Sequence, residues 1–424
     1  MPGSPGSPTA CNTAGLVRDP DVPVPRPTGS SAAASPTRSD TRLAWKRTTL
    51  LFVGHLLNDG FASFFAPLLP LLIHRLDLSL ALAGALGTIR IVTNSLLQPG
   101  LGHLVDRAQR PWLVVLGPLM TVGAMVLIGR VGSFNQLLIV MLASGAGTAL
   151  FHPAAAALVA AERPQRHGLL MAFFSSGGTL GGAIAPIVIV AFVERFSLLR
   201  TPWLLMPGLL ILVAFAIPLR RVLPSMERKE VRRARFRELP PQLVRLWFVI
   251  VLSTTCSTAF ATFLAVLVTE RGGSALAGGA AISVFLLTGA LAGFLAGNLS
   301  DRFGRKRVIL TALVLATPSY LLFLYAPISA ALVFIAAAGI FGLSSVPVGV
   351  VAAQECLPGR TGLVSGLVMG LAWGVGGLAL TPIGWLADRF GLVAVMTVIA
   401  ILPLAAAALM ASYRDPLPAT LATS

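Results

Sequence analysis

Four ionisable side chains lie within long apolar stretches of this sequence. His55 and Asp59 share one stretch, Arg90 lies in the next and His152 in a later one. A charged residue in the middle of a membrane helix costs about 2.5–3.5 kcal/mol, so each is a candidate for function. Carboxyl and imidazole groups bind and release protons. Asp59, His55 and His152 are therefore candidates for proton transfer.

Arg90 belongs to a second polar set. Arg90, Asn94 and Gln98 follow one another at steps of four, which places them on one helix face, as do His55 and Asp59. A guanidinium binds carboxylate, phosphate or phosphonate groups through paired hydrogen bonds. The pattern indicates a site for an anionic or zwitterionic small molecule. Alternatively, Arg90 and Asp59 form an ion pair whose only role is structural.

The role of His152 has two interpretations, because Pro153 follows it directly. The imidazole could relay a proton or contact a bound molecule. It could instead satisfy a backbone carbonyl that the proline leaves unpaired. Two amides, Asn58 and Gln354, complete the candidates for substrate binding. The three cysteines are scattered, and no metal site is predicted.

The composition indicates an integral membrane protein. Of 424 residues, 55% are hydrophobic and 11% are charged, and the mean hydropathy is +0.83. One water-soluble core cannot bury this much apolar surface, so lipid must cover the remainder. The net charge of +16 does not indicate nucleic-acid binding, because the basic residues lie mainly between apolar stretches, where they set orientation.

Twelve apolar stretches have the roughly 20-residue length that spans a bilayer core. Asp59 and Arg90 lie near the middle of theirs, at the depth of the bilayer midplane. The predicted fold is therefore all-α and integral to the membrane, with twelve transmembrane helices. The predicted spans are 48–73, 79–103, 111–130, 136–160, 168–192, 200–219, 246–269, 276–298, 308–326, 330–353, 362–385 and 391–412.

The second half of the chain repeats the first. Residues of the same type stand 194 positions apart: Pro164, Gly168, Gly182 and Glu194-Arg195-Phe196 correspond to Pro358, Gly362, Gly376 and Asp388-Arg389-Phe390. Both copies run in the same direction, and each holds an even number of spans. This predicts two six-helix parallel repeats about an axis along the membrane normal.

These patterns divide the chain into five segments. Residues 1–46 are rich in proline and small residues and are predicted to be a disordered cytoplasmic tail. Residues 47–219 and 246–413 form the two six-helix halves. A basic cytoplasmic linker, 220–245, joins them at the anionic lipid headgroups, and 414–424 is a second cytoplasmic tail. The distribution of Lys and Arg places both termini in the cytoplasm.

The loop after the eighth predicted span resembles the signature loop of the major facilitator superfamily. It reads Gly297-Asn-Leu-Ser-Asp-Arg-Phe-Gly-Arg-Lys306, and a partial copy, Gly102-His-Leu-Val-Asp-Arg-Ala-Gln-Arg110, follows the second span. In this superfamily the loop is associated with switching between outward-open and inward-open states; its alternative role is in orientation and folding. The matching residues are Gly102, Asp106, Arg107, Arg110, Gly297, Asp301, Arg302, Gly304, Arg305 and Lys306.

Further motifs resemble the fosmidomycin-resistance-type branch of that superfamily. They are Gly54-His-Leu-Leu-Asn-Asp59, Ser95-Leu-Leu-Gln-Pro99, Phe151-His-Pro153, Arg166-His-Gly168 and Gln354-Glu-Cys-Leu-Pro-Gly-Arg360. The likeness covers nearly all of the membrane portion. It implies a transporter that exports antibiotics.

The fifth predicted span is rich in glycine. It holds Gly177-Gly-Thr-Leu-Gly-Gly182 and then Ala185-Pro186, and resembles the antiporter motif of the superfamily, with Ala185 in place of a glycine. Small residues also let membrane helices approach closely. The residues expected to pack this helix against a neighbour are Gly177, Gly178, Gly181, Gly182 and Pro186.

We therefore expect a proton-coupled secondary transporter of the bacterial inner (plasma) membrane, which exports a drug-like or phosphonate-type molecule by alternating access. Its partners are the substrate, protons and membrane lipids, and it functions as a monomer. The proton gradient supplies the energy, and no cofactor is expected. An importer of a small organic anion would use the same parts. A non-transporting sensor or scaffold is disfavoured, as is an enzyme, because no zinc-protease or serine-hydrolase motif is present.

Overall fold

The computed structural model describes residues 38–108, 112–160, 167–222, 239–357, 360 and 364–413, without the side chains of residues 38–40, 99, 102–108, 167 and 168. Contacts divide the chain into a short unit, Met1–Thr41, and a large unit, Arg42–Ser424. The large unit holds the helical bundle. All regular structure in the described residues is helical, as the sequence predicts.

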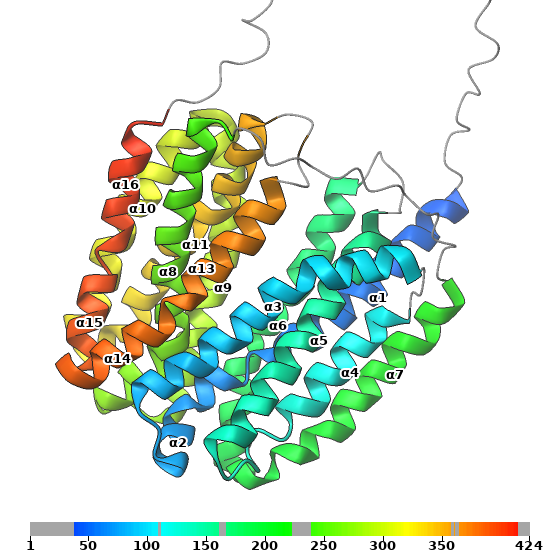
Figure 1. Cartoon of the computed structure of the whole chain (residues 1–424), viewed down its shortest axis with the longest axis horizontal. Coiled ribbons are helices and arrows are strands. Elements are labelled where there is room, and N and C mark those ends of the chain that lie inside the picture. Colours follow the sequence, from blue (N-terminus) through cyan, green and yellow to red (C-terminus); the bar gives the residue numbers. More distant parts are fainter. Residues whose placement is uncertain are drawn as a thin grey trace, which may run out of the picture. The chain divides into compact units, whose positions relative to one another are not determined.

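The predicted apolar stretches fold as helices that pack side by side within the large unit (Figure 1). The first half contains α1 (Arg38–Ala62), α2 (Phe65–Leu76), α3 (Leu80–Ala108), α4 (Leu113–Met125), α5 (Phe134–Ala160), α6 (His167–Phe196), η2 (Leu198–Leu204) and α7 (Leu205–Val222). The second half contains α8 (Pro241–Glu270), α9 (Ala275–Phe303), α10 (Arg305–Tyr325), η3 (Ile328–Ala330), α11 (Ala331–Cys356), η4 (Gly366–Leu371), α13 (Ala372–Leu378), α14 (Leu380–Phe390), α15 (Leu392–Ile399) and α16 (Leu402–Ala411). Among the described residues, eleven segments are long and apolar enough to cross a membrane, and α4 is a shorter apolar helix. Together they account for the twelve predicted spans.

Several helices extend beyond their predicted spans. Helix α1 begins at Arg38, inside the segment predicted to be a tail. Arg47 on this extension donates a hydrogen bond to the carbonyl oxygen of Val222, near the end of α7. The contact fastens the start of the first span to the end of the sixth, which favours a helix where composition alone predicted none.

The first span is broken between α1 and α2 at Ser63 and Phe64. The hydroxyl of Ser63 donates to the backbone carbonyl of Asp59 at 2.7 Å. A serine that competes for a helix carbonyl in this way bends the helix. The break therefore lies one turn beyond Asp59, a predicted functional residue.

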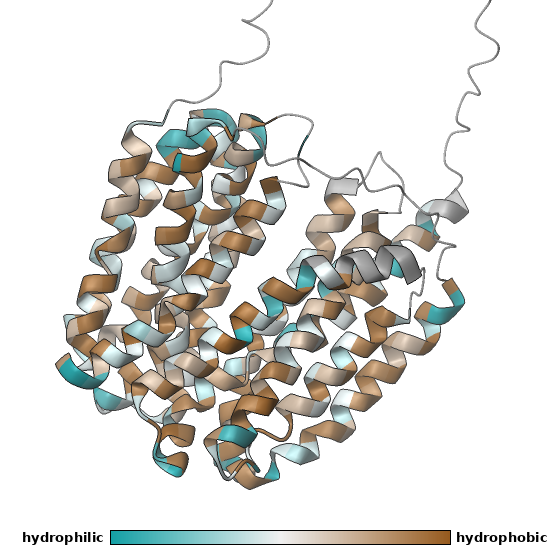
Figure 2. Ribbon diagram, in the orientation of Figure 1, coloured by the Kyte–Doolittle hydropathy of each residue, from teal (hydrophilic) through white to brown (hydrophobic). Residues whose placement is uncertain are grey.

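Apolar side chains cover much of the outside of the helices. Figure 2 shows hydrophobic residues along the helices and hydrophilic ones gathered at many of their ends. Leu96, Met206 and Val333 are exposed by 70%, 68% and 68%, respectively. Such surface needs lipid around it, in agreement with a membrane bundle.

Buried apolar side chains form three clusters. The first-half core contains residues of the first half alone, and the second-half core contains residues of the second half alone. The shared core draws on both halves. Representative members are Leu51, Phe151 and Phe215 in the first-half core, Leu246, Leu313 and Met410 in the second-half core, and Leu69, Phe263 and Ile383 in the shared core.

The shared core lies at one end of the bundle, near the turns that join α2 to α3 and α14 to α15. We call this the far end. The end of α7, the start of α8 and the end of α16 mark the opposite, terminal end (Figure 1). The two halves thus pack together at the far end, and each keeps a core of its own toward the terminal end.

Two acidic residues join the halves at the far end. The carboxylate of Asp388 accepts hydrogen bonds from the backbone nitrogens of Leu80 at 2.7 Å and Ala81 at 2.8 Å, in the first turn of α3. The carboxylate of Glu194 accepts one from Leu276 at 3.1 Å, in the first turn of α9. Each carboxylate satisfies N–H groups that a helix start leaves unpaired. Glu194 and Asp388 begin the repeated triplets. Because of the duplication, each half therefore supplies one carboxylate to a helix start in the other half.

Candidate functional site

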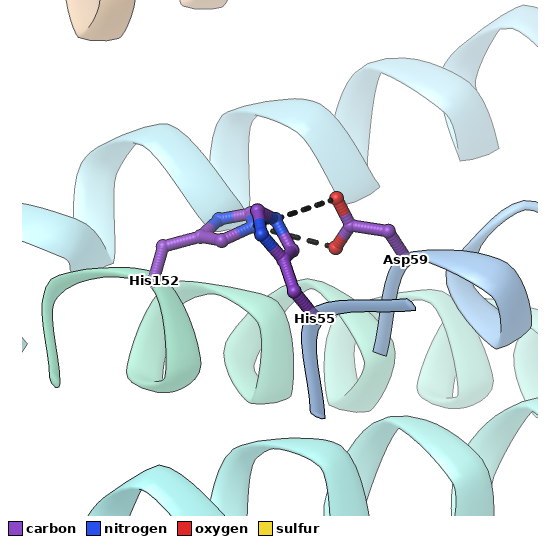
Figure 3. Close-up of side chains that lie close together, drawn as sticks. All are labelled: His55, Asp59 and His152. Carbon is purple, nitrogen blue, oxygen red and sulfur yellow. Dashed lines mark hydrogen bonds and ion pairs between the residues drawn. The ribbon is translucent and has the colours of Figure 1, made fainter. Parts of the chain in front are cut away.

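All three predicted proton-transfer residues meet in the first half (Figure 3). Nε2 of His55 on α1 lies 3.2 Å from Oδ2 of Asp59, and Nε2 of His152 on α5 lies 3.3 Å from Oδ1 of Asp59. The two Nε2 atoms are 3.2 Å apart. The side chain of His55 is 10% exposed, whereas those of Asp59 and His152 are 26% and 28% exposed. We call these three residues the histidine–aspartate cluster; it is open on one side.

The ring of His55 is fixed in orientation. Its Nδ1 lies 3.0 Å from the carbonyl oxygen of Phe174 on α6, and the two rings stack with centroids 4.4 Å apart. Because a carbonyl oxygen only accepts hydrogen bonds, Nδ1 carries the hydrogen and donates it. A neutral His55 therefore directs the lone pair of Nε2 toward Asp59 and His152.

Asn58, a predicted substrate contact, is fully buried beside the cluster. Its Nδ2 donates to Oδ1 of Asp59 at 2.8 Å, and its Oδ1 accepts from the hydroxyl of Thr121 on α4 at 2.9 Å. Asn58 thus connects Asp59 to the interior of the first half and orients its carboxylate.

Glycine at position 178 makes room for the cluster. A Cβ atom on Gly178 of α6 would lie 2.3 Å from Nε2 of His55 and 2.7 Å from Oδ2 of Asp59. Both distances are far shorter than van der Waals contact, so a side chain at this position would displace the cluster.

The other residues of the glycine-rich motif also lie at helix contacts. A Cβ atom on Gly177 would lie 2.5 Å from the carbonyl oxygen of Phe52, and one on Gly181 would lie 2.3 Å from the carbonyl oxygen of Leu56. A Cβ atom on Gly182 would lie 3.5 Å from the hydroxyl of Ser63. The carbonyl oxygen of Pro186 would lie 2.9 Å from a Cβ atom on Gly279 of α9, in the other half. The motif packs α6 against α1 near the cluster and against α9 at the junction of the halves.

Arg90 on α3 lies near the cluster without joining it. Among the described residues, the ion-pair partners of Asp59 are His55 and His152. Arg90 is close enough for its charge to interact with that of Asp59. Its buried Nε has no hydrogen-bond partner within the described part of the chain. The simple Asp59–Arg90 ion pair considered from the sequence is not the arrangement observed.

The remaining predicted substrate contacts fall into two places. Nε2 of Gln98 donates to Oδ1 of Asn94 at 3.0 Å, one turn apart on α3, as the spacing predicts. Gln354, near the end of α11, donates to the hydroxyl of Ser365 at 2.9 Å. Gln354 thus lies toward the terminal end of the second half and not beside the cluster.

The signature loop of the second half forms a charged network. Arg305 at the start of α10 lies 2.5 Å from Asp301 on α9 and 3.0 Å from Glu355 on α11. Gly304 joins the two helices with φ +90°, a conformation that favours glycine.

Other residues of the signature are placed only in part. Lys306 donates to the carbonyl oxygen of Ala411 at 2.6 Å, and Arg302 is exposed. Gly297 on α9 would meet nothing within 4 Å if it carried a Cβ atom. In the first half, Gly102, Asp106 and Arg107 lie on α3 with side chains outside the description, and Arg110 lies outside the described residues.

Two supporting residues were not predicted from the sequence. Phe174 accepts the hydrogen bond that fixes His55, and Thr121 fixes Asn58. A backbone carbonyl carries no sequence signal, and a threonine in an apolar helix is common, so neither stands out. The cluster also brings three ligand atoms within 4.8 Å of one another, although no metal site was predicted.

The sequence model of the Major Facilitator Superfamily matches residues 51–269 and 246–423, which together include both halves. The chain belongs to the major facilitator superfamily. It is therefore a multi-pass membrane transporter and not an enzyme, as its resemblance to that superfamily predicted.

Relatives of this major facilitator include named resistance proteins. The fosmidomycin resistance protein of Escherichia coli K12 is 28% identical over 383 residues, which cover 88% of this chain and 94% of that protein. The multidrug resistance protein MdtG of Escherichia coli 55989 is 28% identical over 66% of this chain and 72% of its own length.

A solved structure shares the fold of this major facilitator. A bacterial homolog of the human lysosomal transporter Spinster, in an inward-facing and occupied conformation, has a TM-score of 0.74 at 17% identity. The match covers 86% of this chain and 95% of the other.

Proposed function

We propose that this transporter is a proton-coupled exporter of a drug-like or phosphonate-type small molecule. The observation that carries the proposal is the histidine–aspartate cluster, a partly exposed carboxylate with two imidazoles inside a membrane span. Ionisable groups at this depth are retained for proton or ion movement. The similarity to a fosmidomycin resistance protein over most of the chain supports efflux.

In this proposal Asp59 carries the coupling proton, and His55 and His152 exchange it with the substrate pathway. The two Nε2 atoms lie 3.2 Å apart, and each lies 3.2–3.3 Å from one oxygen of the Asp59 carboxylate, so a positive charge on the imidazoles stabilises the arrangement. Loss of that proton removes a charge-assisted hydrogen bond to the carboxylate. Protonation therefore changes the internal energy of the first half, which alternating access requires.

Arg90 is the proposed contact for an anionic group of the substrate. Arg90 is half-buried, and its buried Nε lacks a hydrogen-bond partner among the residues that the structure describes, which is costly for a polar group. A phosphonate or carboxylate would supply the missing hydrogen bonds. Asn94 and Gln98, on the same face of α3, are proposed to contact other polar groups of the substrate.

Replacement of Arg90 by Gln tests this assignment. Transport of fosmidomycin, a phosphonate, should fall by about tenfold or more, because a hydrogen bond to a charged group contributes about 1.5–3 kcal/mol. Transport of a neutral compound exported by the same protein should change less. Equal loss for both compounds, measured as initial rates in vesicles, would argue for a structural role.

The packing of the halves fits one state of an alternating-access cycle. The shared core and the two acidic contacts close the far end, and the terminal end has separate cores. We place the terminal end, with both chain termini, in the cytoplasm of the bacterial inner membrane. The structure then corresponds to an inward-facing state.

We also propose that residues 47–219 and 246–413 move as the two halves, with 1–46 and 414–424 as cytoplasmic tails and 220–245 as the linker. The whole cycle takes place within one chain, so a monomer suffices.

Flux direction is the decisive experiment. Inside-out vesicles that contain the protein are given an acidic interior, and radiolabelled fosmidomycin is added outside. Proton-driven export predicts uptake that collapses when an ionophore dissipates the gradient. Vesicles with the opposite orientation and gradient test import of organic anions, and proton-driven uptake only there would replace the exporter with an importer.

A further inference from the structure

The histidine–aspartate cluster brings three potential metal ligands together. Nε2 of His55 lies 3.2 Å from Oδ2 of Asp59, Nε2 of His152 lies 3.3 Å from Oδ1 of the same carboxylate, and the two Nε2 atoms are 3.2 Å apart. One ligand atom from each residue lies within 4.8 Å of the other two. One ion can therefore contact all three side chains.

The 3.2 Å separation between the two imidazole nitrogens matches the geometry of a metal site. Zinc binds histidine nitrogen and carboxylate oxygen at about 2.0–2.2 Å in a tetrahedron, which puts neighbouring ligand atoms about 3.3 Å apart. Imidazole and carboxylate are also the ligand types that divalent transition metals prefer. Figure 3 shows both rings facing the carboxylate of Asp59, with an interaction to each of its two oxygens.

Surrounding residues hold the ligands as metal sites usually do. Metal-binding histidines donate their other ring N–H to a carbonyl or carboxylate, and the ligating carboxylate is itself hydrogen-bonded. Nδ1 of His55 donates to the carbonyl oxygen of Phe174, and Oδ1 of Asp59 accepts from Asn58. Nε2 of His55 is therefore free to bind an ion when the ring is neutral.

The cluster also has an entry side and room for a further ligand. Asp59 and His152 keep about a quarter of their side-chain surface exposed. Sites with three protein ligands leave the fourth position to water or a ligand. Gly178 also lies against the cluster, where even a methyl group would reach Nε2 of His55.

We propose that His55, Asp59 and His152 form a binding site for one divalent transition-metal ion of the Zn²⁺ class. Neither proton coupling nor the identity of the exported compound is needed for the ion to bind. Arg90 lies close enough for its charge to repel the ion, which lowers the affinity that the three ligands provide. An ion at this site occupies the atoms assigned to the proton and therefore competes with protons.

Cobalt provides a direct probe, because its visible spectrum intensifies when the ion becomes tetrahedral. The full chain is purified in detergent with a tag free of histidine, stripped with a chelator and titrated with Co²⁺. One ion per chain should bind, and Zn²⁺ should displace it. His152→Gln and Asp59→Asn should each weaken Co²⁺ binding by about a hundredfold. His74→Gln is the matched control, since His74 is exposed and outside the cluster, and should bind as the wild type does.

The outcomes separate a built site from adventitious binding. Absence of saturable binding to the wild type, or binding unchanged in His152→Gln, would overturn the proposal. X-ray absorption of the Zn²⁺-loaded wild type keeps the test decisive if the variants do not fold. Two imidazole ligands support the site, and a spectrum without imidazole overturns it.

Inhibition of transport is a second measurement, and unlike metal binding it rests on the proposed function. Micromolar Zn²⁺ should inhibit fosmidomycin flux in wild-type vesicles. Saturable Co²⁺ binding without inhibition would leave the metal site standing and count against proton coupling at Asp59, so the two proposals fail separately.

Discussion

The two halves of the bundle make the same helix contact with different chemistry. At the offsets of 194 and 195 positions that relate the halves, Ser253 and Thr254 take the place of Asp59. The hydroxyl of Ser253 on α8 lies 3.1 Å from that of Ser345 on α11. Ser345 stands one position before Val346, which takes the place of His152 at the offset of 194. The position of Gly178 is taken by Ala372, which is fully buried. A half can therefore fold without charge at this contact, which supports the proposed role of the charge in the first half.

The largest expected effect comes from removing that charge. Asp59→Asn should reduce gradient-driven transport to background, because an amide neither binds the coupling proton nor holds a positive charge between the imidazoles. Initial rates in vesicles with an imposed proton gradient measure this. The variant should reach the membrane in normal amounts; gradient-driven flux that survives would remove Asp59 from the coupling step.

A smaller but still large effect on transport is expected at Gly178, whose position is taken by Ala372 in the second half. Gly178→Ala should lower stability by about 1–3 kcal/mol, as overpacking does, and should reduce transport strongly because the cluster must move. Gly182→Ala is the control, since its Cβ would meet only the Ser63 hydroxyl, at 3.5 Å. Thermal unfolding in detergent and flux are compared for both. Similar behaviour of the two variants would contradict the placement of α6 against the cluster.

A moderate effect is expected at the far end, where the halves are joined by like contacts of unequal strength. Asp388→Ala removes two hydrogen bonds and Glu194→Ala removes one. Both should shift the population toward an open far end, and Asp388→Ala should do so more. Distances between spin labels at the start of α3 and the end of α14 report the shift. Arg389→Ala is the control at a neighbouring position. A larger shift for Glu194→Ala would reverse the expected order.

The smallest effect is expected from the second-half counterpart of the cluster. Ser253→Ala should change transport by less than about twofold, because the Ser253 hydroxyl is neutral and has no part in the proposed proton or substrate contacts. The lost hydrogen bond should instead lower stability by about 0.5–1.5 kcal/mol. The same flux assay with Ser345→Ala gives an independent reading. A loss as large as that of Asp59→Asn would mean that the halves share the chemistry after all.

Much of the fold could be predicted because a lipid bilayer allows few backbone conformations. Apolar runs of the right length must be helices, and the twelve predicted spans are confirmed to within a turn or two at most ends. The extension of α1 to Arg38 was missed because it depends on Arg47 meeting Val222, 175 positions away. The break after Asp59 was missed because a serine in a helix bends it only when its hydroxyl turns inward.

The site was predictable one helix at a time. Spacing placed His55 with Asp59 and Asn94 with Gln98, and the hydrogen bonds within α3 follow that spacing. The approach of His152 was not predictable, because it depends on how α5 packs against α1. The sequence indicated that glycines on α6 pack closely, but the partner surface at Gly178, made of His55 and Asp59, is a property of the folded bundle alone.

The arrangement of three cores bears on how the conformational step responds to temperature. Parting the halves at the far end exposes the shared core to water, while the other two cores stay intact. Hydration of apolar surface carries a large heat-capacity change. The rate of that step should therefore follow a curved Eyring plot, whereas exchange of a proton or an ion at the cluster exposes little apolar surface and should follow a straight one.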